Sequence, residues 1–163
     1  MPEKPIYEML ELKVSQLEKK LEKFTVHKDN EKYRILFEQS QDANLIIENE
    51  QFTACNQAAI ELFGYKNKTA LIKVHPSELS PAHQPDGQDS FEKAEKMMEL
   101  ALEKGSNRFE WYHKKANGEI FPAEVLLTTI SHKEGNRSIH VVIRDITARK
   151  QIEKDRKKEK ETL

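Results

Sequence analysis

Apolar residues with the spacing of a coiled-coil seam dominate the first part of the chain. Between Ile6 and Phe24 they recur alternately at four and three residues, which predicts one helix. With this spacing Lys13 and Glu18 fall at heptad positions g and e, where they can pair between two parallel copies of the helix. A lone amphipathic helix packed on its own domain is the alternative interpretation. The seam consists of Leu10, Val14, Leu17, Leu21 and Phe24.

The following segments predict a break, a short helix and a β-hairpin. Residues 26–30 form a polar break, and residues 31–40 predict a helix that needs an apolar surface to lie against. Two apolar runs, 45–47 and 52–55, flank a polar turn, which is the pattern of a hairpin. Cys55 ends the second run and is interpreted as a small buried residue. It is the only cysteine, so an internal disulfide is excluded.

The middle of the chain predicts two helices separated by an irregular segment. Asn56 can cap a helix over residues 57–63, and Gly64 provides the left-handed residue that commonly ends one. Residues 77–90 contain prolines and turn residues and are expected to be irregular. A helical stripe of apolar residues then predicts a longer helix over residues 91–104.

Beyond residue 105 the pattern changes from helical to alternating. Residues 108–113 alternate in the manner of a strand, and an Asn-Gly pair at 117–118 is a strong hairpin turn. Residues 119–130 predict a second long strand, a turn follows at 135–136, and residues 140–146 predict a third strand. Two short strands, a helical middle and three long strands therefore make up the expected order.

The last predicted strand runs directly into a charged tail. Asp145 and Thr147 are residue types that satisfy free N–H groups at a helix start, so the strand is expected to end where a helix begins. Residues 149–163 carry seven basic and four acidic side chains, with Ile152 almost alone as an apolar one. This tail is predicted to be a connector helix without a coiled-coil seam of its own.

Composition narrows the class of protein. Charged residues make up 34% of the chain, but 27 basic and 28 acidic residues leave a net charge of only −1. Such a balance argues against a nucleic-acid or anionic-membrane surface, which needs a basic excess. No apolar run approaches the length of a membrane span, and no signal-peptide core is visible at the start. We therefore expect a cytoplasmic location without membrane contact by this segment.

Several motifs together resemble the PAS domain family. The helix from Asn56 to Tyr65 is similar to the family's signature helix, the Asn-Gly pair at 117–118 matches its strand turn, and residues 144–150 are similar to its Asp-Ile-Thr exit motif. The resemblance implies an α+β fold with a five-stranded antiparallel sheet and helices on one face. It also divides the chain into an N-terminal coiled-coil-type helix (1–30), a PAS domain (31–148) and a C-terminal exit helix (149–163).

The resemblance further implies a sensory or dimerisation module of a bacterial signal-transduction protein, and not an enzyme. A homodimer through the N-terminal seam is expected, with an effector domain of the histidine kinase, diguanylate cyclase or chemoreceptor type downstream. The exit motif Asp145, Ile146 and Thr147 is the expected route of the signal. The alternative is a protein-interaction PAS domain whose core is filled by its own side chains and holds no ligand.

The sequence leaves the content of the pocket open between a small organic ligand and none. Covalent flavin is not expected, because Cys55 does not lie in the reactive-cysteine motif of light-oxygen-voltage domains. Haem is not expected either, because the predicted helix 91–104 has no histidine; His75 and His83 lie just before it, in or near the irregular segment. No histidine spacing suggests a metal site. The pocket candidates are His83, Gln84, Met98, Phe109 and Trp111.

Overall fold

The computed structural model describes residues 4–132 and 134–163. The chain divides into two compact units, one ending at Phe37 and the other comprising Glu38–Leu163.

A single helix, α1 (Lys4–Gln39), forms the first unit and reaches the start of the second. The predicted break at residues 26–30 is therefore wrong. No glycine or proline occurs between Ile6 and Gln39, so the polar residues continue the helix without interrupting its backbone hydrogen bonds. All five seam side chains are more than half exposed, from 53% at Val14 to 68% at Phe24.

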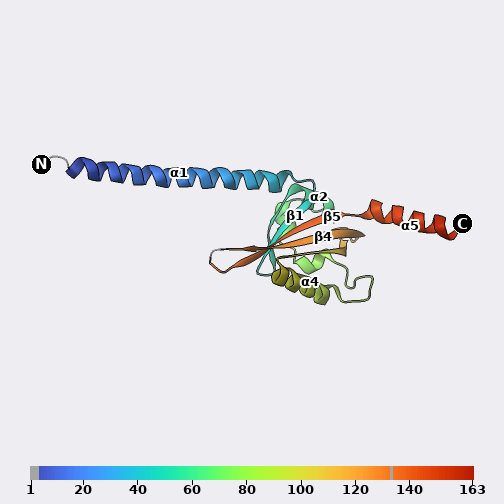
Figure 1. Ribbon diagram of the computed structural model, residues 1–163. Helices are drawn as coiled ribbons and strands as arrows, with labels where there is room; N and C mark the ends of the chain where they lie inside the picture. Colours follow the sequence, from blue (N-terminus) through green and yellow to red (C-terminus); the bar gives the residue numbers. More distant parts are fainter. Residues whose placement is uncertain (1–3, 133) are drawn as a thin grey trace. The chain divides into compact units, whose positions relative to one another are not determined.

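The second unit is built on a five-stranded antiparallel sheet, which confirms the predicted fold class (Figure 1). Its strands lie in the order β2-β1-β5-β4-β3. The β1–β2 turn consists of Asn49 and Glu50, both with positive φ, as a two-residue hairpin of the primed type requires. The strands are β1 (Ala43–Glu48), β2 (Gln51–Cys55), β3 (Ser106–Lys114), β4 (Ile120–Ser131) and β5 (Arg137–Asp145).

Helices α2 and α4 pack on the sheet with the short helical segments between them, and α5 continues from the end of β5 (Figure 1). The capping predictions for α2 are confirmed, because the Asn56 side chain accepts a hydrogen bond from the Ala59 N–H and Gly64 ends the helix with φ +73°. The helical elements are α2 (Gln57–Phe63), α3 (Lys68–Ile72), the 3₁₀ turn η1 (Pro76–Leu79), α4 (Ser90–Lys104) and α5 (Thr147–Glu161).

The core lies between the helices and one face of the sheet. Alternate residues of the long strands are buried there, among them Val125 and Leu127 of β4 and Val141 and Ile143 of β5. Their neighbours point to the other face, because successive side chains of a strand alternate. The prediction for Cys55 is confirmed: its side chain is fully buried, and burial raises the pKa of its thiol.

Asn56 also fixes the segment that leads into the sheet. Its fully buried side chain accepts a hydrogen bond from the Asn44 N–H at 3.0 Å and donates one to the Asp42 carbonyl at 2.9 Å. One amide thereby joins the start of β1 to the start of α2. This contact uses the backbone carbonyl of Asp42, so the Asp42 carboxylate can bind another residue.

Candidate ligand cavity and signal joint

An apolar cavity of about 130 Å³ lies between the sheet, α4 and η1. Phe91, Ala94 and Met98 of α4 form one wall. The opposite wall is the inner face of the sheet, where the lining residues are Ile47, Phe52, Phe109, Trp111, His113, Val125, Leu127, Val141 and Ile143. The walls are therefore mainly hydrocarbon and aromatic, as in pockets that take small organic molecules.

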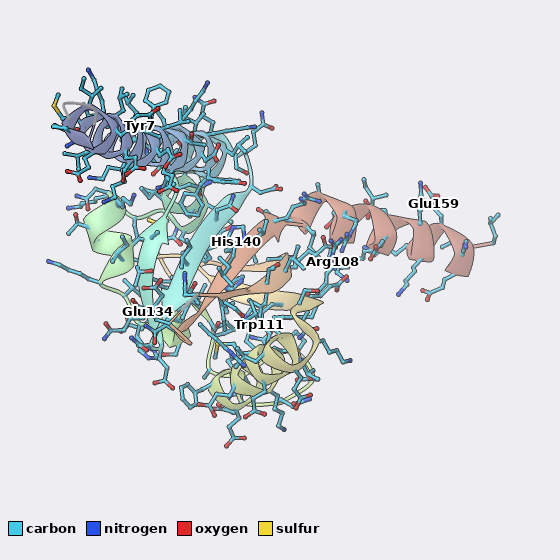
Figure 2. The ribbon with its side chains drawn as sticks, turned by 60° about the vertical axis from the view of Figure 1, so that its left-hand side comes forward. Tyr7, Arg108, Trp111, Glu134, His140 and Glu159 are labelled. Atoms are coloured by element: carbon cyan, nitrogen blue, oxygen red, sulfur yellow. The ribbon has the colours of Figure 1, made fainter. Side chains whose placement is uncertain are left out.

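Trp111 is the largest aromatic side chain of this wall, and it is held in place at its polar end. Its indole N–H donates a hydrogen bond to Ser80 Oγ at 2.9 Å, and its ring lies edge-on to Phe109 at a centroid distance of 5.8 Å. Figure 2 shows Trp111 between the sheet and α4, whereas Arg108 lies toward α5. A buried tryptophan with its N–H satisfied forms a fixed apolar surface.

His113 is the polar residue of the wall. Its Nδ1 lies 3.0 Å from the Leu79 carbonyl oxygen, and its ring packs against Phe63 and Phe121. Its Nε2 is buried and has no hydrogen-bond partner among the described residues. Burial lowers the pKa of His113 to about 4, although the hydrogen bond to Leu79 opposes that shift. The imidazole is therefore neutral near pH 7.

The five predicted pocket residues divide into two groups. Met98, Phe109 and Trp111 line the cavity, whereas His83 and Gln84 are not among its lining residues. The amide of Gln84 instead bonds to the backbone of β3: its Nε2 donates to the Tyr112 carbonyl, and its Oε1 accepts from the Tyr112 N–H. Gln84 thus pairs with the open edge of β3 as a neighbouring strand would.

The remaining cofactor predictions concern residues outside the cavity lining. His83 is exposed on the loop, where it pairs with Asp89 in an isolated bridge, and Cys55 does not line the cavity. Among the described residues no group of three or more metal-ligating side chains lies close enough to hold a metal ion.

The joint between β5 and α5 is organised around Asp145. The Asp145 carboxylate accepts a hydrogen bond from the Thr147 N–H at 2.8 Å, as predicted for a group that satisfies a helix start. Thr147 does not act in this way, because its hydroxyl donates to Asp145 and the N-cap position is Ile146. Ile146 is buried, and its N–H donates to the Pro122 carbonyl of β4. The exit motif is therefore attached to the sheet.

The first turn of α5 is also held by ion pairs to the outer face of the sheet. Lys150 Nζ lies 2.6 Å from a Glu110 carboxylate oxygen, and Arg149 bridges Glu110 at 3.1 Å and Glu124 at 3.5 Å. Glu110 and Glu124 are paired directly across β3 and β4. The hydrogen bond from Lys150 holds the pKa of the Glu110 carboxyl below its ordinary value. We call Glu110, Glu124, Arg149 and Lys150 the exit clamp.

A second ion pair joins the two ends of the PAS fold. Arg144, next to Asp145, donates from Nε at 3.2 Å and from Nη2 at 2.7 Å to the two carboxylate oxygens of Asp42. These contacts hold the pKa of Asp42 below its ordinary value. Such two-point binding is the strongest geometry for an arginine–carboxylate pair. The segment that leads into β1 is thereby linked to the end of β5.

A family model described as "PAS domain" matches residues 41–148. The chain belongs to the PAS domain family. This confirms the resemblance drawn from the motifs at 56–65, 117–118 and 144–150. No curated protein matches the chain.

Solved structures share the PAS fold at low sequence identity. A PAS domain from a two-component sensor histidine kinase is 18% identical, with a TM-score of 0.59 over 74% of this chain and 98% of that one. A PAS domain from Colwellia psychrerythraea is 19% identical, with a TM-score of 0.62 over 72% and 97%. A third, from a LuxR-family transcriptional regulator of Burkholderia thailandensis in complex with ethanol, is 19% identical, with a TM-score of 0.58 over 70% and 96%.

No helix in the described part of the chain combines the length and hydropathy needed to cross a membrane. Two features of the site were not predicted from the sequence. His113 was not assigned to the cavity wall, and Glu110 and Glu124 were not connected with the first turn of α5. The two adjacent basic residues after the exit motif, Arg149 and Lys150, were the signal that could have indicated the exit clamp.

Proposed function

We propose that this PAS domain is a sensory module that binds a small molecule in the cavity and passes the resulting change to α5. One observation carries the proposal: the same strands form the cavity wall on one face and bind α5 on the other. Phe109 and Trp111 of β3 line the cavity, and Glu110 between them binds Arg149 and Lys150. On β4, Val125 lines the cavity and its neighbour Glu124 binds Arg149.

Because cavity-lining and α5-binding residues alternate along β3 and β4, a shift in the cavity can reach α5 through these strands. A molecule that enters the cavity changes the packing of the inner side chains, and a close-packed wall transmits such a shift to its own backbone. The outward carboxylates move with the strands that carry them. Because surface ion pairs contribute little individually, a small displacement suffices to strengthen or release the exit clamp. The role proposed is therefore binding and signalling, not catalysis.

A substitution that fills part of the cavity tests the route without a known ligand. Ala94 lines the cavity, so Ala94→Leu adds apolar volume inside it, whereas Ala82→Leu adds the same volume on an exposed loop outside the lining. We expect Ala94→Leu to change amide hydrogen exchange across α5 by about twofold or more, as the loss of one ion pair would. Ala82→Leu should leave α5 unchanged. An unaltered α5 in a folded Ala94→Leu protein would contradict the proposal.

The proposal includes a homodimer formed through α1. The seam side chains are exposed along the helix, and the Lys13 and Glu18 positions suit a parallel pair. Leu17 lies on the seam and Leu12 outside it, and their exposures are similar at 58% and 61%. Leu17→Lys should weaken the dimer at least about tenfold in sedimentation, since it buries a charge in the seam, while Leu12→Lys should not. Equal effects of the two substitutions would exclude this seam.

We further propose that the module acts upstream of an effector domain, of the histidine kinase, diguanylate cyclase or chemoreceptor type, in a cytoplasmic signalling protein. The similarity to PAS domains from a sensor histidine kinase and from a transcriptional regulator supports this placement. The alternative function, a protein-interaction domain with a self-filled core, is less well supported, because a cavity of about 130 Å³ lies inside the fold.

A further inference from the structure

His113 is one of the residues that line the cavity, and its Nε2 is a buried polar atom that no described residue satisfies. Its chemical state follows from its neighbours. A carbonyl oxygen only accepts hydrogen bonds, so the contact between Nδ1 and the Leu79 carbonyl places the imidazole proton on Nδ1. Nε2 of the neutral ring therefore carries a lone pair and is a hydrogen-bond acceptor.

Two other buried polar groups of the lining are already paired. The Trp111 N–H donates to Ser80, and the Ser90 hydroxyl accepts from Gln84 Nε2. Most native buried polar groups have a partner, and an unmade hydrogen bond in an apolar site is costly. Nε2 of His113 is thus the position at which a donor from outside the chain would gain most.

Water is a poor occupant for this position. A buried water normally makes two to four hydrogen bonds, and here a single acceptor lacks a partner among the described side chains. Most of the surface exposed to the cavity is apolar, although Glu50, His75 and Glu95 also line it, so a suitable occupant combines one donor with a mainly apolar body. Its size is limited as well: a dry cavity of about 150 Å³ accommodates benzene, and this one measures about 130 Å³.

We propose that the cavity takes a neutral, mainly apolar molecule about the size of one six-membered ring, whose O–H or N–H group donates a hydrogen bond to Nε2 of His113. The inference rests on the proposed function, since it names the class of ligand for the same cavity. Anions are disfavoured, because the acceptor repels a carboxylate and a neutral imidazole cannot offset its charge.

Phenol and toluene form a matched pair of probes for the full chain, because they differ in one hydroxyl in place of a methyl group. We expect phenol to bind about tenfold more tightly than toluene, since only phenol satisfies the buried acceptor. Affinities can be followed by the amide resonances of Met98 and Trp111, and the ¹⁵N resonance of His113 Nε2 should move with phenol alone. Benzoate at neutral pH should not bind.

His113→Leu should reverse the preference for phenol, because the phenol hydroxyl would then be buried without an acceptor. If this variant fails to fold, the ¹⁵N measurement on the unaltered protein still tests whether phenol binds to Nε2 of His113. Equal affinity for the two probes, with no movement of the Nε2 resonance, would overturn the role of His113 but leave a ligand-binding cavity. If none of the probes bound, ligand binding in this cavity, and with it the proposed function, would also be contradicted.

Discussion

The two faces of strand β3 lie in different surroundings. The inner face presents Phe109, Trp111 and His113 to an apolar cavity, and the histidine is neutral because it is buried. The outer face presents Glu110, which remains half exposed and is bound by Arg149 and Lys150. One strand thus carries a packed, water-excluding wall and a hydrated ionic contact.

The two faces of β3 make different contributions to folding stability. The inner face provides stability, because packing and burial of apolar surface contribute most of the favourable free energy of folding. The outer face contributes little to global stability, since exposed ion pairs are worth roughly 0–1 kcal/mol each. A contact of that strength can be made and broken without unfolding the domain, which suits a joint that transmits a signal.

The largest expected effect compares two adjacent aromatic residues of β3. Trp111→Ala removes a buried side chain and should lower the free energy of unfolding by about 4 kcal/mol. Tyr112→Ala on the outer face should lower it by less than about 1.5 kcal/mol, because Tyr112 is only partly buried. Urea denaturation monitored by circular dichroism measures both. Similar losses would show that the two faces do not differ in packing as described.

Acid should act on the inner face through His113. Its pKa is lowered from 6.5 to about 4 by burial, so the unfolded state binds the proton more readily and stability falls as the pH drops below 6.5. Between pH 7 and pH 5 this should cost about 2 kcal/mol in the free energy of unfolding.

His113→Gln should remove that part of the pH dependence. The pKa of His140 is also lowered by burial, but His140 is present in both proteins, so their difference isolates His113. Denaturation curves at several pH values provide the comparison. Parallel pH dependences in the two proteins would show that His113 is accessible to protons in the folded state.

A smaller effect is expected on the outer face. Glu110→Gln removes the charge that binds Arg149 and Lys150 and should speed amide exchange in the first turns of α5 by about twofold to fivefold. Glu103→Gln, at an exposed position of α4 without an ion pair in the described chain, is the matched control and should have no effect on α5. Exchange of the inner strands should stay the same in both variants.

The smallest effect is that of salt. Raising sodium chloride from about 0.05 M to about 0.5 M shortens the screening length severalfold and should weaken the exit clamp, with up to about twofold faster exchange in α5. Amides of β4 and β5 behind the cavity should not respond. A uniform response of the whole domain would mean that salt acts on folding and not on the exit clamp.

Local signals in the sequence were sufficient for most elements of the fold. The capping residues of α2, the left-handed glycine that follows it and the Asn-Gly turn each determine their own backbone, so the strand and helix order could be predicted. The continuity of α1 could not, because a polar run ends a helix only when a glycine, proline or competing cap does so.

The site was less predictable because its residues are brought together over long distances. Gln84 was proposed as a pocket residue. An amide side chain can bind any nearby backbone group, and in the structure it binds the backbone of Tyr112 at the open edge of β3. Glu110 and Arg149 are 39 residues apart, and their contact depends on the direction in which α5 leaves the sheet. His113 alternates in phase with the inward-facing Phe109 and Trp111, but histidine is also common on surfaces, and its burial depends on packing against Phe63 and Phe121.

Coupling between the cavity and α5 through the exit clamp can be measured with a double-variant cycle. Hydrogen exchange of residues 147–161 would be measured in the unaltered protein, in Ala94→Leu, in Glu110→Gln and in the combination of both. We expect Ala94→Leu to change α5 exchange when Glu110 is present, and most of this change to be lost in the Glu110→Gln background. An equal change in both backgrounds would contradict this coupling.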